Sequence, residues 1–248
     1  MTLTEKKSID YRDRIIVALD VKSKTEALEL LARLENQVKF VKVGMELFYA
    51  EGYPLIELLK KRNLRIFLDL KMHDIPNTVG RTTAQLTRLG VDMFNLHVAG
   101  GSKMMEEARN QMERALIARQ ERPLLIGVTQ LTSTDERILR EEIGIAKSVK
   151  EIVLHYAKLA KKSGLDGVVS SALEVKSVKE ACGPSFLTVT PGIRLAGESA
   201  HDQKRITTPK QAINLGSDYL VIGRSITKAE NPAKTFETIV NSLNKLSN

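Results

Sequence analysis

Short apolar runs alternate with amphipathic stretches along almost the whole chain, and this alternation restricts the fold more than any other feature. The runs are rich in Ile, Val, Leu and Phe, which is typical of strands buried on both faces. They cover residues 14–19, 40–43, 65–70, 93–97, 124–129, 167–170, 187–190 and 219–222. Strands that alternate with helices in this way predict a parallel sheet.

Eight strand–helix units in 248 residues favour a closed (β/α)8 barrel of the TIM type over an open doubly wound sheet. No Gly/Pro/Ser-rich linker interrupts the pattern. We therefore expect an α/β fold with one barrel domain over residues 1–248, of which 1–13 form a polar N-terminal extension. Helices are expected after a cap at Ser23, over 53–62, 78–89, 102–119, 147–163, 173–181 and 232–246, and from 209, with a short inserted helix near 135–141.

The net charge of +8 suggests nucleic-acid binding, but the distribution of charge does not. Lys and Arg are spread along the chain and interleaved with Asp and Glu. Only 4% of residues are aromatic and there is no Trp, so a platform for stacking bases is not expected. The charge indicates a solvated basic surface that attracts anions, with no nucleic-acid partner.

Cysteine usage and hydropathy bear on the compartment. Cys182 is the only cysteine, so no disulfide framework is expected and a reducing cytosol fits best. The polar start of the chain lacks the apolar core of a secretory signal. No apolar run approaches the roughly 18 residues of a membrane span. We expect a soluble, cytoplasmic protein with no membrane partner.

Polar residues at the carboxyl ends of the strands are the candidates for chemistry, because barrels of this type carry their active sites there. Asp69 and Lys71 are two residues apart on the third strand and should share a face, away from Leu68 and Leu70. A buried ion pair that closes the barrel is the structural alternative.

Asp74, three residues after Lys71, favours a catalytic role. A lysine flanked by carboxylates stays charged, which argues against a Schiff-base nucleophile. A charged ammonium can instead stabilise a carbanion and then protonate it. The spacing therefore predicts proton delivery to carbon.

Lys42 lies between two valines of the second strand and should point into the barrel if those valines face the helices. Lysine is rarely buried without a partner, and Asp20 and Asp69 on the adjacent strands are suitable ones. An alternating array of lysines and aspartates would follow. The alternative is a lysine whose stem lies along apolar surface while its ammonium stays in water.

A phosphate site is predicted after the last two strands, where barrels commonly bind phosphate. Gly223 allows close approach of the backbone, and Arg224 supplies charge-assisted hydrogen bonds. Residues 191–194 open a polar loop after the seventh strand, in which Arg194 and Gln203 could close over a phosphate.

The remaining motifs point to neither a metal nor a cofactor. One Cys and four scattered His form no zinc constellation, although His97 ends a strand and could face the barrel mouth. No G-x-G-x-x-G opens a helix after a strand, so a dinucleotide is not expected.

The run 69–78, D-L-K-M-H-D-I-P-N-T, closely resembles the signature of the orotidine 5'-phosphate decarboxylase family. The resemblance extends in the family's order over nearly the whole chain, through the segments 17–20, 41–44, 131–133, 190–194 and 222–224. The chain looks like the bacterial, monofunctional form, because no fused phosphoribosyltransferase domain is present.

The resemblance implies decarboxylation of orotidine 5'-phosphate to UMP and CO2 in de novo pyrimidine biosynthesis, without metal or cofactor. By similarity, Lys71 protonates C6 and Asp69 lies close to the departing carboxylate. The other implied substrate contacts are Asp20 and Lys42 to ribose hydroxyls, Thr132 to the pyrimidine, Arg194, Gln203, Gly223 and Arg224 to phosphate, and Pro191 beside them.

The resemblance also implies a homodimer. Asp74 would reach across the interface into the neighbouring subunit's site and count there among the catalytic residues. Ile75 and Thr78 would lie beside it.

Two other functions remain open. Mg²⁺-dependent sugar-phosphate lyases of the same superfamily share an Asp-x-Lys-x-x-Asp strand, but they use an acidic metal ligand where this chain has Lys42, a cation that would oppose Mg²⁺. A non-catalytic nucleotide-binding barrel is the second alternative. The array around Lys71 argues against it, because a binding protein has no need of such a costly cluster.

Overall fold

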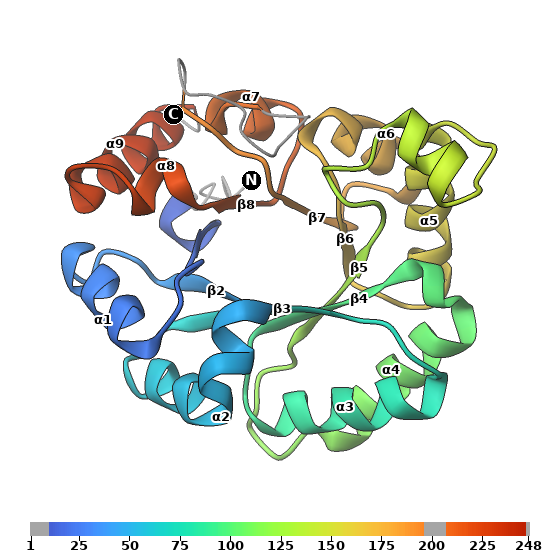
Figure 1. Ribbon diagram of the computed structural model, residues 1–248, viewed down its shortest axis with the longest axis horizontal. Helices are drawn as coiled ribbons and strands as arrows, with labels where there is room; N and C mark the ends of the chain where they lie inside the picture. Colours follow the sequence, from blue (N-terminus) through green and yellow to red (C-terminus); the bar gives the residue numbers. More distant parts are fainter. Residues whose placement is uncertain (1–9, 196–206, 247–248) are drawn as a thin grey trace, which may run out of the picture.

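The eight predicted strands form one closed parallel barrel, surrounded by helices (Figure 1). The computed structural model describes residues 10–195 and 207–246. The strands are β1 Ile15–Ala18, β2 Phe40–Gly44, β3 Arg65–Met72, β4 Met93–His97, β5 Leu124–Val128, β6 Gly167–Val169, β7 Leu187–Thr190 and β8 Tyr219–Ile222. Each strand pairs with the next, and β1 pairs with β8. The single-barrel prediction is confirmed.

Helices follow the strands as the sequence pattern predicts. They are α1 Lys24–Arg33, α2 Met45–Lys61, α3 Pro76–Arg88, α4 Ser102–Ala115, α5 Val149–Lys162, α6 Ala172–Cys182, α7 Pro209–Asn214, α8 Arg224–Thr227 and α9 Pro232–Asn244, with the short helices η1 Tyr11–Asp13, η2 Val98–Gly100 and η3 Ile138–Glu142. Ser23 caps α1 as expected, since its side chain accepts a hydrogen bond from the Glu26 backbone N–H. Within the described ranges, no helix is both long enough and apolar enough to cross a membrane.

Some helix boundaries differ from the predicted ones. The helix expected from residue 53 is only the second half of α2, which starts at Met45 and bends at Gly52 (φ 62°), two residues before Pro54. The fourth helix ends at Ala115 rather than at 119, because Leu116 adopts an extended backbone. The inserted helix near 135–141 is a π-helical turn. The expected N-terminal extension contains η1, whose Tyr11 is buried.

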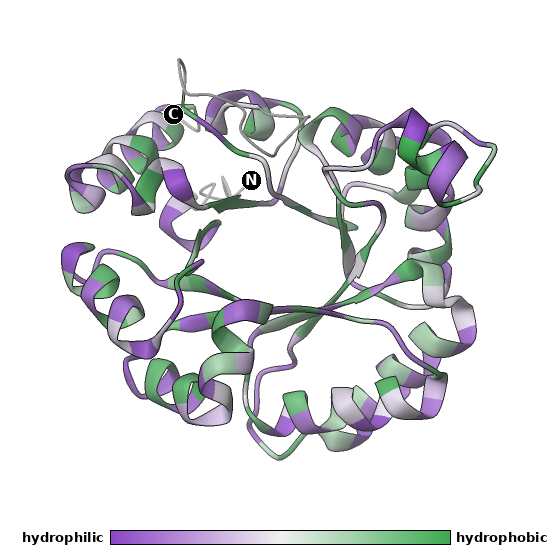
Figure 2. Cartoon of the chain, viewed as in Figure 1, coloured by the Kyte–Doolittle hydropathy of each residue, from purple (hydrophilic) through white to green (hydrophobic). Residues whose placement is uncertain are grey.

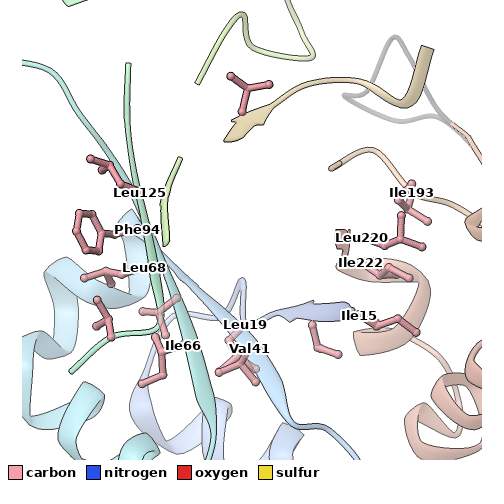
Figure 3. Packing of buried hydrophobic residues seen from close by; sticks show 14 of the residues in the cluster. Ile15, Leu19, Val41, Ile66, Leu68, Phe94, Leu125, Ile193, Leu220 and Ile222 are labelled. Atoms are coloured by element: carbon pink, nitrogen blue, oxygen red, sulfur yellow. The ribbon is translucent and has the colours of Figure 1, made fainter. Parts of the chain in front are cut away.

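The strands are continuous apolar runs because their residues belong to two apolar layers, one against the helices and one inside the barrel. Alternate strand residues pack outward against the helices, and Figure 3 shows part of this layer. The residues between them fill the inside of the barrel: Ile16, Ala18, Phe40, Phe67, Met93, Ile126, Val189 and Val221. The helices carry both hydrophobic and hydrophilic residues, as amphipathic helices around a barrel should (Figure 2).

The inner layer decides which residues come next at the carboxyl ends of the strands. Ala18, Phe40 and Phe67 belong to it, so the inward positions two residues further on are Asp20, Lys42 and Asp69. The valines on either side of Lys42 belong to the outer layer, as its predicted inward direction requires. The barrel is therefore filled by apolar residues below and by charged residues above.

Candidate active site

A cavity of about 460 Å³ opens at the carboxyl ends of the strands, where the polar residues were predicted to gather. Its floor is the top of the inner apolar layer, including Phe67, Val189 and Val221. Nearly all of the predicted barrel-mouth residues line it: Asp20, Lys42, Asp69, Lys71, Thr132, Pro191, Arg194, Gly223 and Arg224. Residues from six different strand ends therefore meet in one site.

Two lysines and two aspartates form a continuous ion array in this cavity. Lys42 Nζ lies 2.8 Å from Asp20 Oδ1 and 3.5 Å from Asp69 Oδ2. Lys71 Nζ lies 2.7 Å from Asp69 Oδ1. Asp69 thus stands between two ammonium groups, each near a different carboxylate oxygen. The alternation that the sequence predicted for Asp20, Lys42, Asp69 and Lys71 is present.

The array keeps its buried members charged. Burial alone would lower the pKa of Lys42, but Asp69 and Asp20 outweigh it and raise that pKa above its ordinary value. Burial would likewise raise the pKa of Asp69, but Lys42 and Lys71, with hydrogen bonds from Lys71 and Asn95, hold it below its usual range. Asp69 is therefore an anion, and Lys42 a cation, at neutral pH.

The backbone of β3 leaves regular geometry where it carries this chemistry. Lys71 has φ 52°, a left-handed conformation that is uncommon for a residue with a side chain. The pairing of β3 with β4 shifts between Leu68 and Met72. Asp69 and Lys71 do meet, but through this irregularity rather than through the simple strand alternation from which their common face was predicted.

Asn95 holds this irregular segment, and the sequence reasoning missed it. Its Nδ2 donates to Asp69 Oδ1 at 2.7 Å, and its Oδ1 accepts from the Lys71 backbone N–H at 2.8 Å. Asn95 is only 1% exposed. The available signal was an amide residue within the apolar run of β4, at an inward position two residues after Met93.

The far side of the cavity carries the predicted phosphate residues. Gly223 precedes α8, and Arg224 is its first residue. Arg194 is buried, and its Nε has no hydrogen-bond partner in the described ranges, although its Nη1 donates to the carbonyl of Ile193. Lys228, which the sequence reasoning did not select, also lines the cavity. Gln203 lies outside the described residues.

The described lining is strongly cationic. It contains five cationic side chains, Lys42, Lys71, Arg194, Arg224 and Lys228, against the two carboxylates Asp20 and Asp69. An excess of fixed positive charge in a concave site attracts anionic ligands. This cavity suits a small molecule that carries more than one negative charge.

The predicted residues at the start of α3 lie apart from the cavity lining. Asp74, Ile75 and Thr78 are all exposed, and Ile75 has 65% of its surface accessible. Asp74 Oδ1 accepts a hydrogen bond from the Ile75 backbone N–H at 2.6 Å. Among the described residues, the ion pair of Lys71 is with Asp69, and none joins it to Asp74.

His97 stands next to the array without lining the cavity. Its ring lies 5.5 Å from the ring of His73, at an angle of 41°. Burial, followed by the nearby His73 and Lys71, lowers the pKa of His97, although Asp69 opposes this. The neutral form of His97 is therefore favoured. Among the described residues, no group of three or more His, Cys, Asp or Glu side chains could hold a metal ion.

Comparison with known proteins places the chain in a family. The family model described as "Orotidine 5'-phosphate decarboxylase / HUMPS family" matches residues 13–239. The chain belongs to this family. The matched range contains the whole barrel from β1 to β8 and every residue of the ion array.

Named members of the family are similar over most of their length. The orotidine 5'-phosphate decarboxylases of Bacillus cytotoxicus and Bacillus mycoides are each 55% identical over 225 residues, which is 91% of this chain and 94% of theirs. A solved orotidine 5'-phosphate decarboxylase from Lactobacillus acidophilus shares 42% identity and a TM-score of 0.84, covering 93% of this chain and 99% of that one. An uncharacterized conserved protein from Geobacillus kaustophilus shares 48% identity and a TM-score of 0.82, covering 92% and 98%.

Proposed function

We propose that this protein decarboxylates orotidine 5'-phosphate to UMP and CO2, without metal or cofactor, and that Lys71 protonates C6. The observation that carries the proposal is the Lys42–Asp69–Lys71 array on one wall of a cationic cavity. The activity named for relatives at 55% identity supports the choice of substrate. The same residues suit a reaction that develops negative charge on carbon.

Lys71 has the charge and position for this chemistry. Loss of CO2 leaves an electron pair at C6, and no cofactor delocalises it. The Lys71 ammonium, fixed 2.7 Å from Asp69, can stabilise that pair and then transfer a proton to it. Asp69 would lie beside the substrate carboxylate, so its negative charge would be relieved of a like neighbour as CO2 departs.

The other lining residues would bind the remaining parts of the substrate. Asp20 and Lys42, hydrogen-bonded to each other at 2.8 Å, are suited to ribose hydroxyls. Thr132 would contact the pyrimidine. The phosphate would be bound by Arg194, Gln203, Gly223 and Arg224, with Pro191 beside them. The buried Nε of Arg194, which has no hydrogen-bond partner in the part of the chain that the structure describes, supports this assignment.

We further propose a cytoplasmic homodimer in which Asp74 completes the partner's site, with Ile75 and Thr78 beside it. Asp74 lies close to Lys71 in sequence, yet it is exposed and is not among the residues that line the cavity of its own chain. At the same end of the barrel, α2 exposes Met45, which is 45% accessible, and Tyr49, which is 75% accessible. A second copy of the chain would cover such side chains.

The activity is tested by following the ultraviolet absorbance of orotidine 5'-phosphate, with and without EDTA. We expect turnover that EDTA does not affect and that Lys71→Ala abolishes. The control variant is Lys176→Ala, which removes an exposed lysine of α6 and should leave turnover unchanged. Loss of activity in EDTA would favour the Mg²⁺-dependent lyases, and no turnover by the unmodified protein would favour a nucleotide-binding barrel.

The shared site is tested by mixing two inactive variants, Lys71→Ala and Asp74→Ala. If Asp74 serves the partner subunit, each mixed dimer contains one intact site and the mixture recovers about a quarter of the unmodified activity. No recovery on mixing, with mixed dimers shown by native mass spectrometry, would place both residues in one subunit's site.

A further inference from the structure

We infer that Asn95 is a positioning residue that sets the geometry of the Asp69–Lys71 pair. The inference rests on the proposed function for its catalytic meaning. Asn95 does not line the cavity, so it would act through the two residues that do. Its side chain contacts both of them, one through its donor and the other through its acceptor.

The first contact compensates for a break in the sheet. Regular pairing between β3 and β4 is lost from Leu68 to Met72, so the backbone N–H of Lys71 has no regular ladder partner. Asn95 Oδ1 accepts from that N–H at 2.8 Å. A backbone N–H that is taken out of water without an acceptor destabilises the folded state. The amide oxygen therefore stabilises Lys71 in its left-handed conformation (φ 52°).

The second contact fixes the carboxylate. Asp69 Oδ1 accepts from Asn95 Nδ2 and from Lys71 Nζ, both at 2.7 Å, while Oδ2 faces Lys42 at 3.5 Å. Two donors on one oxygen hold the carboxylate plane and direct Lys71 Nζ. Because Asn95 is 1% exposed, water does not compete for these contacts. A neutral amide can do this without changing the charge of the array.

Asn95→Leu removes both contacts while keeping a similar volume. We expect kcat to fall about 100-fold, the scale of a misplaced catalytic group, while binding of UMP changes less than about threefold. The expected split arises because the cationic phosphate residues Arg194 and Arg224 lie elsewhere in the cavity. A kcat within threefold of the unmodified value would overturn the inference.

Asn95→Asp separates the two contacts through a pH profile. The new carboxyl keeps an acceptor for the Lys71 N–H, but as an anion it repels Asp69. When protonated it can donate to Asp69, as the amide does. The activity of this variant, relative to the unmodified protein, should therefore rise as the pH falls from 8 to 5.5, whereas the Asn95→Leu ratio should stay flat. If the relative activities of Asn95→Asp and Asn95→Leu change with pH in the same way, a positioning role for Asn95 is contradicted.

A readout independent of activity is hydrogen exchange at the Lys71 amide. Exchange should accelerate strongly in Asn95→Leu and remain slow in Asn95→Asp. The matched control is Thr188→Val, which removes a fully buried hydroxyl that bonds Asp218 at the opposite end of the barrel and should change neither kcat nor Lys71 exchange. If the unmodified protein does not decarboxylate the substrate, the proposed function fails, and Lys71 exchange still decides whether Asn95 holds that backbone.

Discussion

The two ends of the barrel use the same residue type in opposite ways. At the amino end, a Gly-x-Asp sequence precedes three of the four even-numbered strands, and its glycine has a positive φ each time. These sequences are Gly90-x-Asp92 before β4, Gly164-x-Asp166 before β6 and Gly216-x-Asp218 before β8. At the carboxyl end, Asp20 and Asp69 line an open cavity.

Each of these three aspartates accepts hydrogen bonds from a backbone N–H and from a cationic side chain. Asp218 Oδ2 accepts from the Thr188 backbone N–H at 2.7 Å and from Lys179 Nζ at 2.6 Å. Asp166 repeats the arrangement one strand pair earlier with the cation Arg122, and Asp92 repeats it two strand pairs earlier with the cation Lys60. In all three cases the cation precedes the odd-numbered strand and the aspartate precedes the next strand. These contacts fix strand register.

The carboxyl end instead keeps charge available to a ligand. Its described lining has more cations than carboxylates, and its β3 backbone is irregular at Lys71. The amino end therefore stabilises the barrel, while the carboxyl end tolerates local strain. This agrees with the general division of such barrels into a stabilising and a reactive face.

Among the changes that test this contrast between the two ends, Asp69→Asn should give the largest effect, and the effect should be on catalysis. It leaves two ammonium groups, Lys42 and Lys71, without the carboxylate between them. We expect kcat to fall about 1000-fold, since the proton donor loses both its orientation and its charge partner. Single-turnover kinetics would measure this. Asp166→Asn at the amino end is the control, and a similar loss there would break the comparison.

Asp218→Ala should act on stability and not on catalysis. It leaves Lys179 and the Thr188 N–H without their shared acceptor. We expect the free energy of unfolding to fall by about 2 kcal/mol, and Tm by about 6 °C, with kcat of the folded protein unchanged. Urea titration and calorimetry measure the loss. A kcat reduced tenfold or more would show that the two ends are coupled.

Ionic strength should affect ligand binding at the carboxyl end. We expect Kd for UMP to rise roughly fivefold between 0.05 and 0.5 M NaCl, because salt screens the cationic lining. Isothermal titration calorimetry would measure it, with Arg194→Ala expected to show a shallower salt dependence. A Kd that does not change with salt would contradict the claim that the charges at the carboxyl end attract the ligand.

The smallest effect is expected from His97 under acidic conditions. The pKa of His97 is lower in the folded protein than the ordinary 6.5, so the unfolded chain binds its proton more readily. The stability that a neutral His97 provides is therefore present above pH 6.5 and is lost as the pH falls below it. In His97→Asn, the decrease in Tm between pH 7 and pH 5 should be smaller than in the unmodified protein by about 1–3 °C. An identical decrease in both proteins would contradict this.

The periodic features of the molecule could be predicted from sequence. Strand alternation gave the eight strands, the barrel and the inward direction of Lys42, because each depends on a repeated pattern of buried residues. The bend at Gly52 and the early end of α4 could not be read in the same way, since they depend on the backbone of single residues.

The residues that form the site could be predicted from the sequence better than their arrangement in space. The charged residues at the strand ends were identified because barrels place chemistry there. Asn95 was missed because its role depends on a register shift between β3 and β4, which no single strand reveals. The exposed position of Asp74 also follows from the turn into α3, not from its spacing to Lys71.

Closure of the barrel has a consequence for how the protein is made. The first strand forms hydrogen bonds with the last, and residues from both ends of the chain line the cavity. While β8 is still inside the ribosome, β1 and β7 expose unpaired edges, and Arg224 is not yet available. Every nascent chain therefore passes through a stage with two open sheet edges and no complete site. A stop codon before residue 219 should yield an aggregation-prone fragment rather than a weakly active enzyme.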